Sequence, residues 1–591
     1  MGAVTLPGWA TNMRQIFRAE TVSQFVLTGA INDLVPHRED DRLRFLPLKQ
    51  YLTEVLFQPF EVVIVYDRGR GISVAKGYDH FLQYLQIFDK FHGTRLASDG
   101  GVAGDPNRAL ESPGMLPRAP AQALELIDRF LNGVVALHRN QIKSGPRSVA
   151  VVLDYAHFLV PRGESLYMSG EIGANLIKIM NWAEDPAITA ANIATVLLAE
   201  NLYDLSALIA DSPYSAKIRI ELPNREEIQD FVAQLVKDES AFSRLCEVDV
   251  PTLAGKLVGL SRVNIKNLVL RALRNDETLS MKYLTRLKKE VIEKEAFGKL
   301  EFIESRRTLD DVAGHEAAKQ WLREDAVLLR KGSINALPMG YLITGRIGTG
   351  KTYIVECFAG EVGIPFVQFK NFREKWVGAT EGNLEKIFNI LHALGQVVVF
   401  IDEADQATGK RGGGEGDSGL SGRIYGMLAK EMADTANRGK ILWIFATSRP
   451  DLLEVDLKRQ GRLDVHIPLF PPDDEPGKRE LFLAMAAKLK VALKPDEVPA
   501  FDFPEPVSGN ELEGLLVRAI RRYELQQSEP KMELPEILRM VAGEFRPSAH
   551  TAQLEMMDLL AVKECTDERF LPARFRDLTS KEIDRRLDAL T

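Results

Sequence analysis

The sequence has little cysteine, no long apolar run and no excess of positive charge. Its three cysteines, Cys246, Cys357 and Cys565, lie far apart in 591 residues. They form neither a disulfide framework nor a metal-binding spacing, and this fits a reducing compartment. Without an 18-residue apolar stretch or a leading basic region, we expect a cytoplasmic protein with no transmembrane anchor. The net charge of −8 argues against a dedicated nucleic-acid binder.

The composition, 45% hydrophobic and 27% charged, is that of a globular chain long enough for about three or four domain-sized units. Short apolar runs alternate with helix-like segments, which predicts an α/β fold. We expect a helix over residues 46–57 and a Gly- and Pro-rich surface insertion at about 92–122. The expected strands of the first half are residues 25–28, 61–66, 149–154, 194–199 and 218–222.

A glycine-rich motif follows the apolar run at residues 341–343. It has the pattern G-x-x-x-x-G-K-T and consists of Gly345, Gly348, Thr349, Gly350, Lys351 and Thr352. The glycines let backbone N–H groups curl around a phosphate, and the Lys351 ammonium can reach the terminal phosphates. Thr352 supplies a hydroxyl for Mg²⁺. The motif therefore predicts binding of ATP and Mg²⁺.

Two carboxylates follow the next strongly apolar segment, residues 397–401. Asp402 is expected to hold the Mg²⁺ shell, and Glu403 to polarise the attacking water. The alternative is a pair of acids capping a strand in an ordinary α/β domain. The order of the two motifs favours phosphoryl transfer.

The spacing of strand ends recurs in the two halves of the chain. Asp154 and Asn201 are 47 residues apart, and Asp402 and Ser448 are 46 apart. The next two intervals, which end at an isoleucine and at a helix start, are 19 and 42 residues in both halves. This repetition predicts two tandem P-loop-type modules, each a parallel sheet sandwiched by helices with a helical lid.

The first module lacks the catalytic residues of the second. Residues 28–33 contain no Gly-Lys-Thr, and Tyr155 follows Asp154 where the second module has a glutamate. We interpret this module as a degenerate copy with a structural or partner-binding role. Weak nucleotide binding there stays open.

A zinc-protease motif is suggested by His315-Glu316 but is incomplete. That motif requires a histidine at its fifth position, and this chain has Lys319. We therefore reject it.

The second module resembles the AAA family of the AAA+ ATPases, in the branch that includes NSF and FtsH. The two-module arrangement is similar to AAA proteins of plastids and cyanobacteria whose first module is inactive. The motifs that carry the resemblance are Asp-Val-Ala-Gly at 311–314, the phosphate loop, Lys-Trp-Val-Gly at 375–378, Ile-Asp-Glu-Ala-Asp at 401–405, residues 446–464 and the lid segment 508–512.

The resemblance implies a domain order. The expected domains are a degenerate α/β domain (1–223), its helical lid (224–280), a helical linker (281–307), a catalytic α/β domain (308–470), a second lid (471–527) and a helical tail (528–591). The tail could dock on a ring, recruit a partner or complete the lid.

The resemblance also implies roles for individual residues. Asp311 and Val312 should contact the nucleotide. Arg459 and Arg462 should reach into the ATP site of the neighbouring subunit as arginine fingers, which makes hydrolysis depend on assembly. The segment of the first module between residues 205 and 218 contains no arginine, so that copy cannot supply a finger.

Ser448 departs from the family pattern. The family usually places an asparagine there to orient the attacking water. Serine can still form a hydrogen bond but has a shorter reach, so we expect slower turnover. Thr447 could share the role.

Trp376, Val377 and Gly378 resemble the pore loop with which ring-forming relatives grip unfolded polypeptide. Alternatively, Trp376 anchors the loop in the core of its own subunit. Residues 408–422 occupy the place of a second pore loop, and a flexible linker is the other interpretation.

Our leading hypothesis is an Mg²⁺-ATP hydrolase that assembles into a homo-oligomeric ring, expected to be a hexamer, and remodels or threads a protein substrate. A nucleotide-gated scaffold is the alternative, in which the degenerate module holds a partner and slow hydrolysis resets assembly. A nucleic-acid motor is a third hypothesis. The sequence lacks basic or aromatic nucleic-acid motifs, which argues against it.

Overall fold

The structure is a computed structural model of the chain. It describes residues 6–39, 42–94, 96–97, 116–142, 145–163, 170–237, 239, 241–296, 298–370, 381–405, 418–501, 506–526, 532–546 and 550–590. The chain divides into two compact units. The first comprises Met1–Val291 with Ala379–Ala393, and the second Ile292–Gly378 with Leu394–Thr591.

The first unit is built on a sheet with the strand order β5-β4-β6-β7-β1-β8. All neighbours are parallel except β4 and β5, so the predicted parallel sheet has an antiparallel edge strand. Its strands are β1 (Gln24–Gly29), β4 (Val62–Asp67), β5 (Gly71–Lys76), β6 (Val149–Leu153), β7 (Ile193–Leu198) and β8 (Ser215–Ile220).

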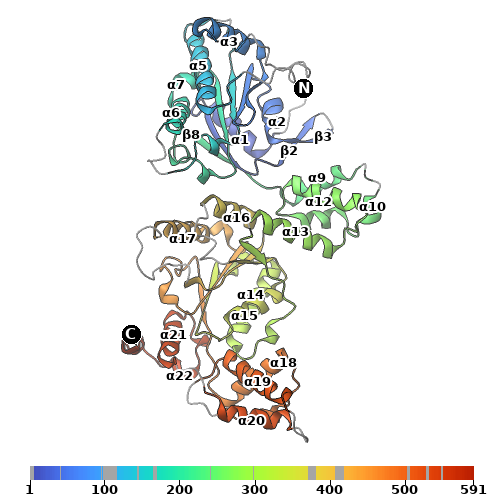
Figure 1. Ribbon diagram of the computed structural model, residues 1–591, viewed down its shortest axis with the longest axis vertical. Coiled ribbons are helices and arrows are strands. Elements are labelled where there is room, and N and C mark those ends of the chain that lie inside the picture. Colours follow the sequence, from blue (N-terminus) through green and yellow to red (C-terminus); the bar gives the residue numbers. More distant parts are fainter. Residues whose placement is uncertain are drawn as a thin grey trace. The chain divides into compact units, whose positions relative to one another are not determined.

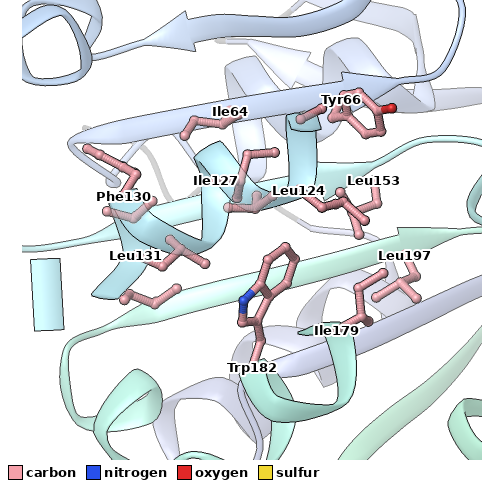
Figure 2. Close-up of a cluster of buried hydrophobic side chains, with 14 of the residues drawn as sticks. Ile64, Tyr66, Leu124, Ile127, Phe130, Leu131, Leu153, Ile179, Trp182 and Leu197 are labelled. Carbon is pink, nitrogen blue, oxygen red and sulfur yellow. The ribbon is translucent and has the colours of Figure 1, made fainter. Parts of the chain in front are cut away.

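Helices cover both faces of this sheet (Figure 1). Successive strand residues point to opposite faces, so near-continuous apolar strands build two cores. One core packs against α5 and α6, and Figure 2 shows Trp182 of α6 and Leu131 of α5 among its side chains. The Trp182 indole N–H also donates to Asp128 Oδ1 (2.7 Å). The other core packs against α1 and α2.

The helices of the first half of the chain follow the strands and then form the lid. They are α1 (Gly8–Arg18), α2 (Leu48–Tyr51), α3 (Tyr78–His92), α5 (Pro120–Arg139), α6 (Glu171–Glu184), α7 (Pro186–Ala190), α8 (Ala207–Ala210), α9 (Arg225–Leu235), α10 (Phe242–Leu245), α11 (Val250–Leu257), α12 (Arg262–Arg274) and α13 (Met281–Glu295).

Two expectations for the first half need correction. The helix predicted for residues 46–57 begins at Leu48 and continues as a π-helical turn, Leu52–Leu56. The residues before it form an antiparallel hairpin of β2 (Leu34–Glu39) and β3 (Arg42–Pro47). The insertion predicted at 92–122 is shorter at its end because α5 begins at Pro120. Residues 98–115 lie outside the described part of the chain.

The second unit contains a sheet with the order β14-β10-β13-β12-β11-β9. Only the edge pair β9 and β11 is antiparallel among these neighbours. Because β9 joins this sheet, the segment 281–307 is not wholly a helical linker. The strands are β9 (Leu300–Phe302), β10 (Gly340–Thr344), β11 (Phe366–Phe369), β12 (Val397–Ile401), β13 (Ile441–Thr447) and β14 (Val465–Pro468).

The remaining helices include those of the second lid and the tail. They are α14 (Glu316–Lys331), α15 (Lys351–Val362), α16 (Glu381–Leu394), α17 (Ser418–Ala433), α18 (Glu475–Lys488), α19 (Gly509–Glu524), α20 (Leu534–Glu544), α21 (Thr551–Glu564), α22 (Ala573–Arg576) and α23 (Ser580–Leu590). The tail serves two purposes. Helix α20 completes the lid core with α18 and α19, whereas α21 packs against β14.

The two sheets share the order of their five parallel strands. Strands β4, β6, β7, β1 and β8 match β11, β12, β13, β10 and β14. The antiparallel edge strand differs, because β5 directly follows β4 in the chain whereas β9 precedes β10. The prediction of two related α/β modules is therefore confirmed.

Candidate nucleotide site

The phosphate loop leaves the carboxyl end of β10, a central strand of the second sheet. Gly345 has φ = 142°, and a Cβ there would lie 2.2 Å from the Leu469 carbonyl oxygen. Only glycine fits this close approach. Gly350, with φ = 84°, then caps the start of α15. The loop therefore ends at a helix N-terminus, where backbone N–H groups and the helix dipole favour an anion.

Lys351 is held inside this loop by oxygen acceptors. Its Nζ donates to the carbonyls of Gly345 (2.9 Å) and Arg346 (3.0 Å) and to Ser448 Oγ (2.8 Å). Burial lowers the pKa of Lys351 to about 8, and the nearby carboxylates, led by Asp402, oppose that shift. The ammonium is thus positioned at the centre of the site by the loop itself.

Thr352 and Asp402 come together from different elements. Thr352 lies in the first turn of α15, and Asp402 follows β12. The Thr352 hydroxyl donates to Asp402 Oδ2 over 2.8 Å. A hydroxyl and a carboxylate are hard oxygen donors of the kind that Mg²⁺ takes, so this pair fits the ion.

Glu403 sits on a tight turn that aims it away from the strand. It has φ = 47°, and its backbone N–H donates to Asp402 Oδ1 (2.9 Å). Its side chain is exposed. The first module repeats this turn, since Tyr155 has φ = 52° and its N–H donates to Asp154 Oδ1 (3.0 Å).

Ser448 follows β13, the strand beside β12, so it lies at the same sheet edge as Asp402. The preceding Thr447 is engaged elsewhere. Its hydroxyl donates to Asp405 Oδ1 (2.6 Å) and accepts from the N–H of Arg449 (2.9 Å). Ser448, and not Thr447, therefore contacts the phosphate-loop lysine.

The segment before α14 borders the loop. Asp311 Oδ2 accepts from the N–H of Thr308 (2.8 Å), and Val312 is buried with its carbonyl bonded to Lys319 Nζ (2.8 Å). His315, next to the backbone of Thr349, has its pKa lowered to about 4 by burial. This imidazole is therefore neutral near pH 7.

The second lid contacts the phosphate loop directly. Ser508 caps α19 in a capping box with Glu511. The next backbone N–H, of Gly509, donates to the Gly348 carbonyl over 3.2 Å. A movement of the lid would therefore change this hydrogen bond to the phosphate loop.

One contact at the site was not anticipated from sequence. Arg346, inside the phosphate-loop motif, is buried and donates through Nε to Asp558 Oδ1 of α21 (2.9 Å), with a second bond from Nη2 to Oδ2. Its Nη1 donates to the Pro506 carbonyl (3.3 Å). A charged loop residue gives no sequence signal of burial, and its partner lies 212 positions away.

The two predicted finger arginines lie beyond this cluster, after β13. Arg459 is 70% exposed and lies 3.5 Å from Asp456. Arg462 also pairs with Asp456 and is largely covered. The geometry leaves Arg459 available at the surface of the unit. The predicted pore loop, Trp376 to Gly378, and residues 406–417 lie outside the described residues.

Three family models match consecutive parts of the chain. Residues 2–221 match the N-terminal Rossmann-like domain of AAA+ chaperones, and residues 226–297 their second helical domain. Residues 341–470 match the ATPase family associated with various cellular activities, AAA. The candidate site lies within this last match.

Curated relatives match about a third of the chain or less. A cell division cycle protein 48 homolog of Archaeoglobus fulgidus is 32% identical over 211 residues, covering 34% of this chain and 28% of the relative. An ATP-dependent zinc metalloprotease FtsH 1 of Salinibacter ruber is 35% identical over 177 residues, 28% of this chain and 26% of the relative. The chain therefore spans little more than a quarter of the length of these relatives.

The fold and the site define an ATPase of the AAA+ class. Its second module contains an AAA-family ATPase domain similar to the Cdc48 and FtsH relatives of the NSF/FtsH-like branch, and AAA+ chaperone-type domains precede it. Within the described residues, no helix has the length and apolarity needed to cross a membrane.

Proposed function

We propose that the second module hydrolyses Mg²⁺-ATP and that this hydrolysis drives an oligomer which remodels or threads a protein substrate. The observation that carries the proposal is the convergence of Lys351, Thr352, Asp402 and Ser448 at one sheet edge. These residues come from three elements, and their donors and acceptors suit a polyphosphate with a metal ion.

Binding of the nucleotide falls to the phosphate loop. Lys351 exchanges its three protein acceptors for the terminal phosphates, and the α15 N-terminus faces the remaining phosphate charge. Thr352 and Asp402 would hold Mg²⁺, which when bound offsets charge that develops on the phosphates. Asp311 and Val312 lie in the segment whose His315 contacts the Thr349 backbone of the loop, and we assign them to the nucleotide on this ground and on the resemblance.

Water activation falls to Glu403. Its turn places an exposed carboxylate beside Asp402, where it can accept a proton from the attacking water. Ser448 is assigned to orienting that water, because its hydroxyl already lies at the phosphate-loop lysine. Thr447 is a weaker candidate because its hydroxyl is used by Asp405 and Arg449.

Assembly of subunits would bring further positive charge to the γ-phosphate. Arg459 is exposed, and Arg462 shares its ion-pair partner Asp456. Either guanidinium could therefore bind the nucleotide of a neighbouring subunit. A planar cation at the γ-phosphate of that neighbour stabilises transition-state charge. Relatives named as a Cdc48 homolog and as ATP-dependent FtsH proteases support action on proteins. We assign the pore-loop role to Trp376, Val377 and Gly378 on the resemblance alone.

Steady-state ATP hydrolysis by the Glu403→Gln variant tests this proposal. Loss of the base should lower kcat by about 10²–10⁴-fold while ATP still binds. Tyr155→Phe is the matched control, since Tyr155 occupies the same turn in the first module, and it should leave kcat unchanged. Equal rates for wild type and Glu403→Gln would contradict the assignment.

A further inference from the structure

A cavity of about 810 Å³ lies in the first unit. It is bordered by the start of α1, the chain just after β1, the end of β8 and the first turn of α12. Its size falls in the range of small-molecule sites, roughly 300–1,000 Å³. Trp9, Phe45 and Leu222 supply apolar wall, and the lining also contains four basic and four acidic residues.

This cavity occupies the position of the ATP site of the second unit. Both sites follow the equivalent central strand, β1 or β10, and border the equivalent edge strand, β8 or β14. A lid helix begins at each site, α12 in the first unit and α19 in the second. In the second unit the N–H of Gly509 donates to the phosphate loop, and in the first the N–H of Val263 donates to Asp33 Oδ1 (3.0 Å).

The part of the site that would take a polyphosphate has been replaced. The β2–β3 hairpin stands where the second unit has its phosphate loop. The Lys49 ammonium forms an ion pair with Asp154, the counterpart of Asp402. A side-chain cation therefore sits on the carboxylate that would otherwise share a metal ion. Neither a triphosphate nor its Mg²⁺ finds equivalent partners here.

The wall of the cavity retains unused hydrogen-bonding capacity. Asp33 and Arg262 are only 4% and 5% exposed, and Asp33 Oδ2 and Arg262 Nε have no hydrogen-bond partner among the described residues. Arg262 Nη1 lies 3.5 Å from that oxygen and also donates to the Leu34 carbonyl (3.2 Å). Burying a polar atom without a partner is unfavourable, so a ligand that engages these atoms is favoured.

We infer that this cavity binds a purine nucleoside carrying at most one phosphate. The aromatic and aliphatic wall suits a flat heterocycle, and Asp33 can accept from a hydroxyl or amino group. The balanced wall charge suits a neutral or weakly anionic ligand and opposes a triphosphate. The first unit would then sense a nucleoside or nucleoside monophosphate without hydrolysing a nucleotide.

Calorimetric titration of the full chain with AMP, adenosine and Mg²⁺-ATP tests this inference. The titrated protein carries Lys351→Ala, which weakens nucleotide binding by the second unit. Gly8→Trp is added to fill the cavity, because Gly8 lines it, has an ordinary φ and leaves open space where a Cβ would stand. AMP or adenosine should bind one site per chain, at least about tenfold more weakly after Gly8→Trp.

Gly543→Trp is the matched control, because Gly543 is a helical glycine of α20 with equally open surroundings. It should leave AMP binding unchanged. Arg262→Gln should also weaken AMP. Absence of AMP and adenosine binding, binding that ignores Gly8→Trp, or tighter binding of Mg²⁺-ATP at the Gly8-sensitive site would each overturn the inference. Since the readout is binding by a Lys351→Ala chain, its failure is separate from failure of ATP hydrolysis by the second unit.

Discussion

Ser448 is the residue at which the proposed ATP site departs from the pattern of the AAA family. Its short side chain reaches Lys351 Nζ at 2.8 Å, so the hydroxyl is committed to the phosphate-loop lysine before nucleotide binds. An asparagine amide extends further and carries both donors and an acceptor. It could contact the lysine and the attacking water together.

We therefore expect Ser448→Asn to raise kcat by about threefold or more, with little change in KM, because the gain arises in the transition state. Steady-state kinetics at saturating Mg²⁺-ATP measures this. The first module provides a reciprocal control, since Asn201 occupies the counterpart position and pairs with Asp204 (2.9 Å). Asn201→Ser should leave turnover unchanged. An unaltered kcat in Ser448→Asn would remove the proposed water-orienting role.

At the scale of elements, the unexpected connection is between the phosphate loop and the C-terminal helix α21. Arg346 and Asp558 form a two-bond ion pair in which both side chains are buried. The Arg346 carbonyl meanwhile accepts bonds from Lys351 and from the Thr349 hydroxyl (2.9 Å). The tail thus fixes the loop residue whose backbone positions the lysine.

Asp558→Asn should destabilise the second unit by about 3–5 kcal/mol, because it leaves a buried guanidinium without its counter-charge. It should also weaken ATP binding, as the loop loses its anchor. Thermal unfolding and ATP titration measure the two effects. Asp584→Asn is the matched control, because its pair with Lys563 (2.7 Å) is 54% exposed on both sides and should contribute under about 0.5 kcal/mol.

A double substitution that removes both charges tests whether α21 can hold the phosphate loop by apolar packing alone. Arg346→Met with Asp558→Leu should recover most of the stability lost in Asp558→Asn, because apolar residues of similar volume can replace a buried ion pair. Equal stability and ATP affinity in Asp558→Asn and Asp584→Asn would contradict the anchoring role of α21.

The elements that sequence predicts well are those whose signal is local. The phosphate loop is recognisable because Gly345 and Gly350 mark backbone that other residues cannot adopt, and the strand ending at Asp402 because its apolar run is continuous. The hairpin β2–β3 was missed because its strands mix charged and apolar residues. The burial of Arg346 depends on Asp558, and no local pattern links residues so far apart in the chain.

At the scale of the whole chain, one fold is used twice with different chemistry. Both sheets share the order of their five parallel strands, and both place a left-handed turn after the equivalent aspartate. In the second module that turn presents Glu403, and in the first it presents Tyr155, with Lys49 on the neighbouring carboxylate. The first module thus has the same framework around this position but other residues where the second module has its phosphate loop.

The central claim is that ATP binding at this site assembles the chain so that Arg459 and Arg462 can act in trans. The most direct test is the mass of the Glu403→Gln protein by light scattering, with and without Mg²⁺-ATP. This variant should retain ATP and trap the assembly that ATP favours. The account predicts a shift from 66.0 kDa to a closed multiple of that mass. A monomer that demonstrably holds ATP would contradict it and favour a nucleotide-gated scaffold.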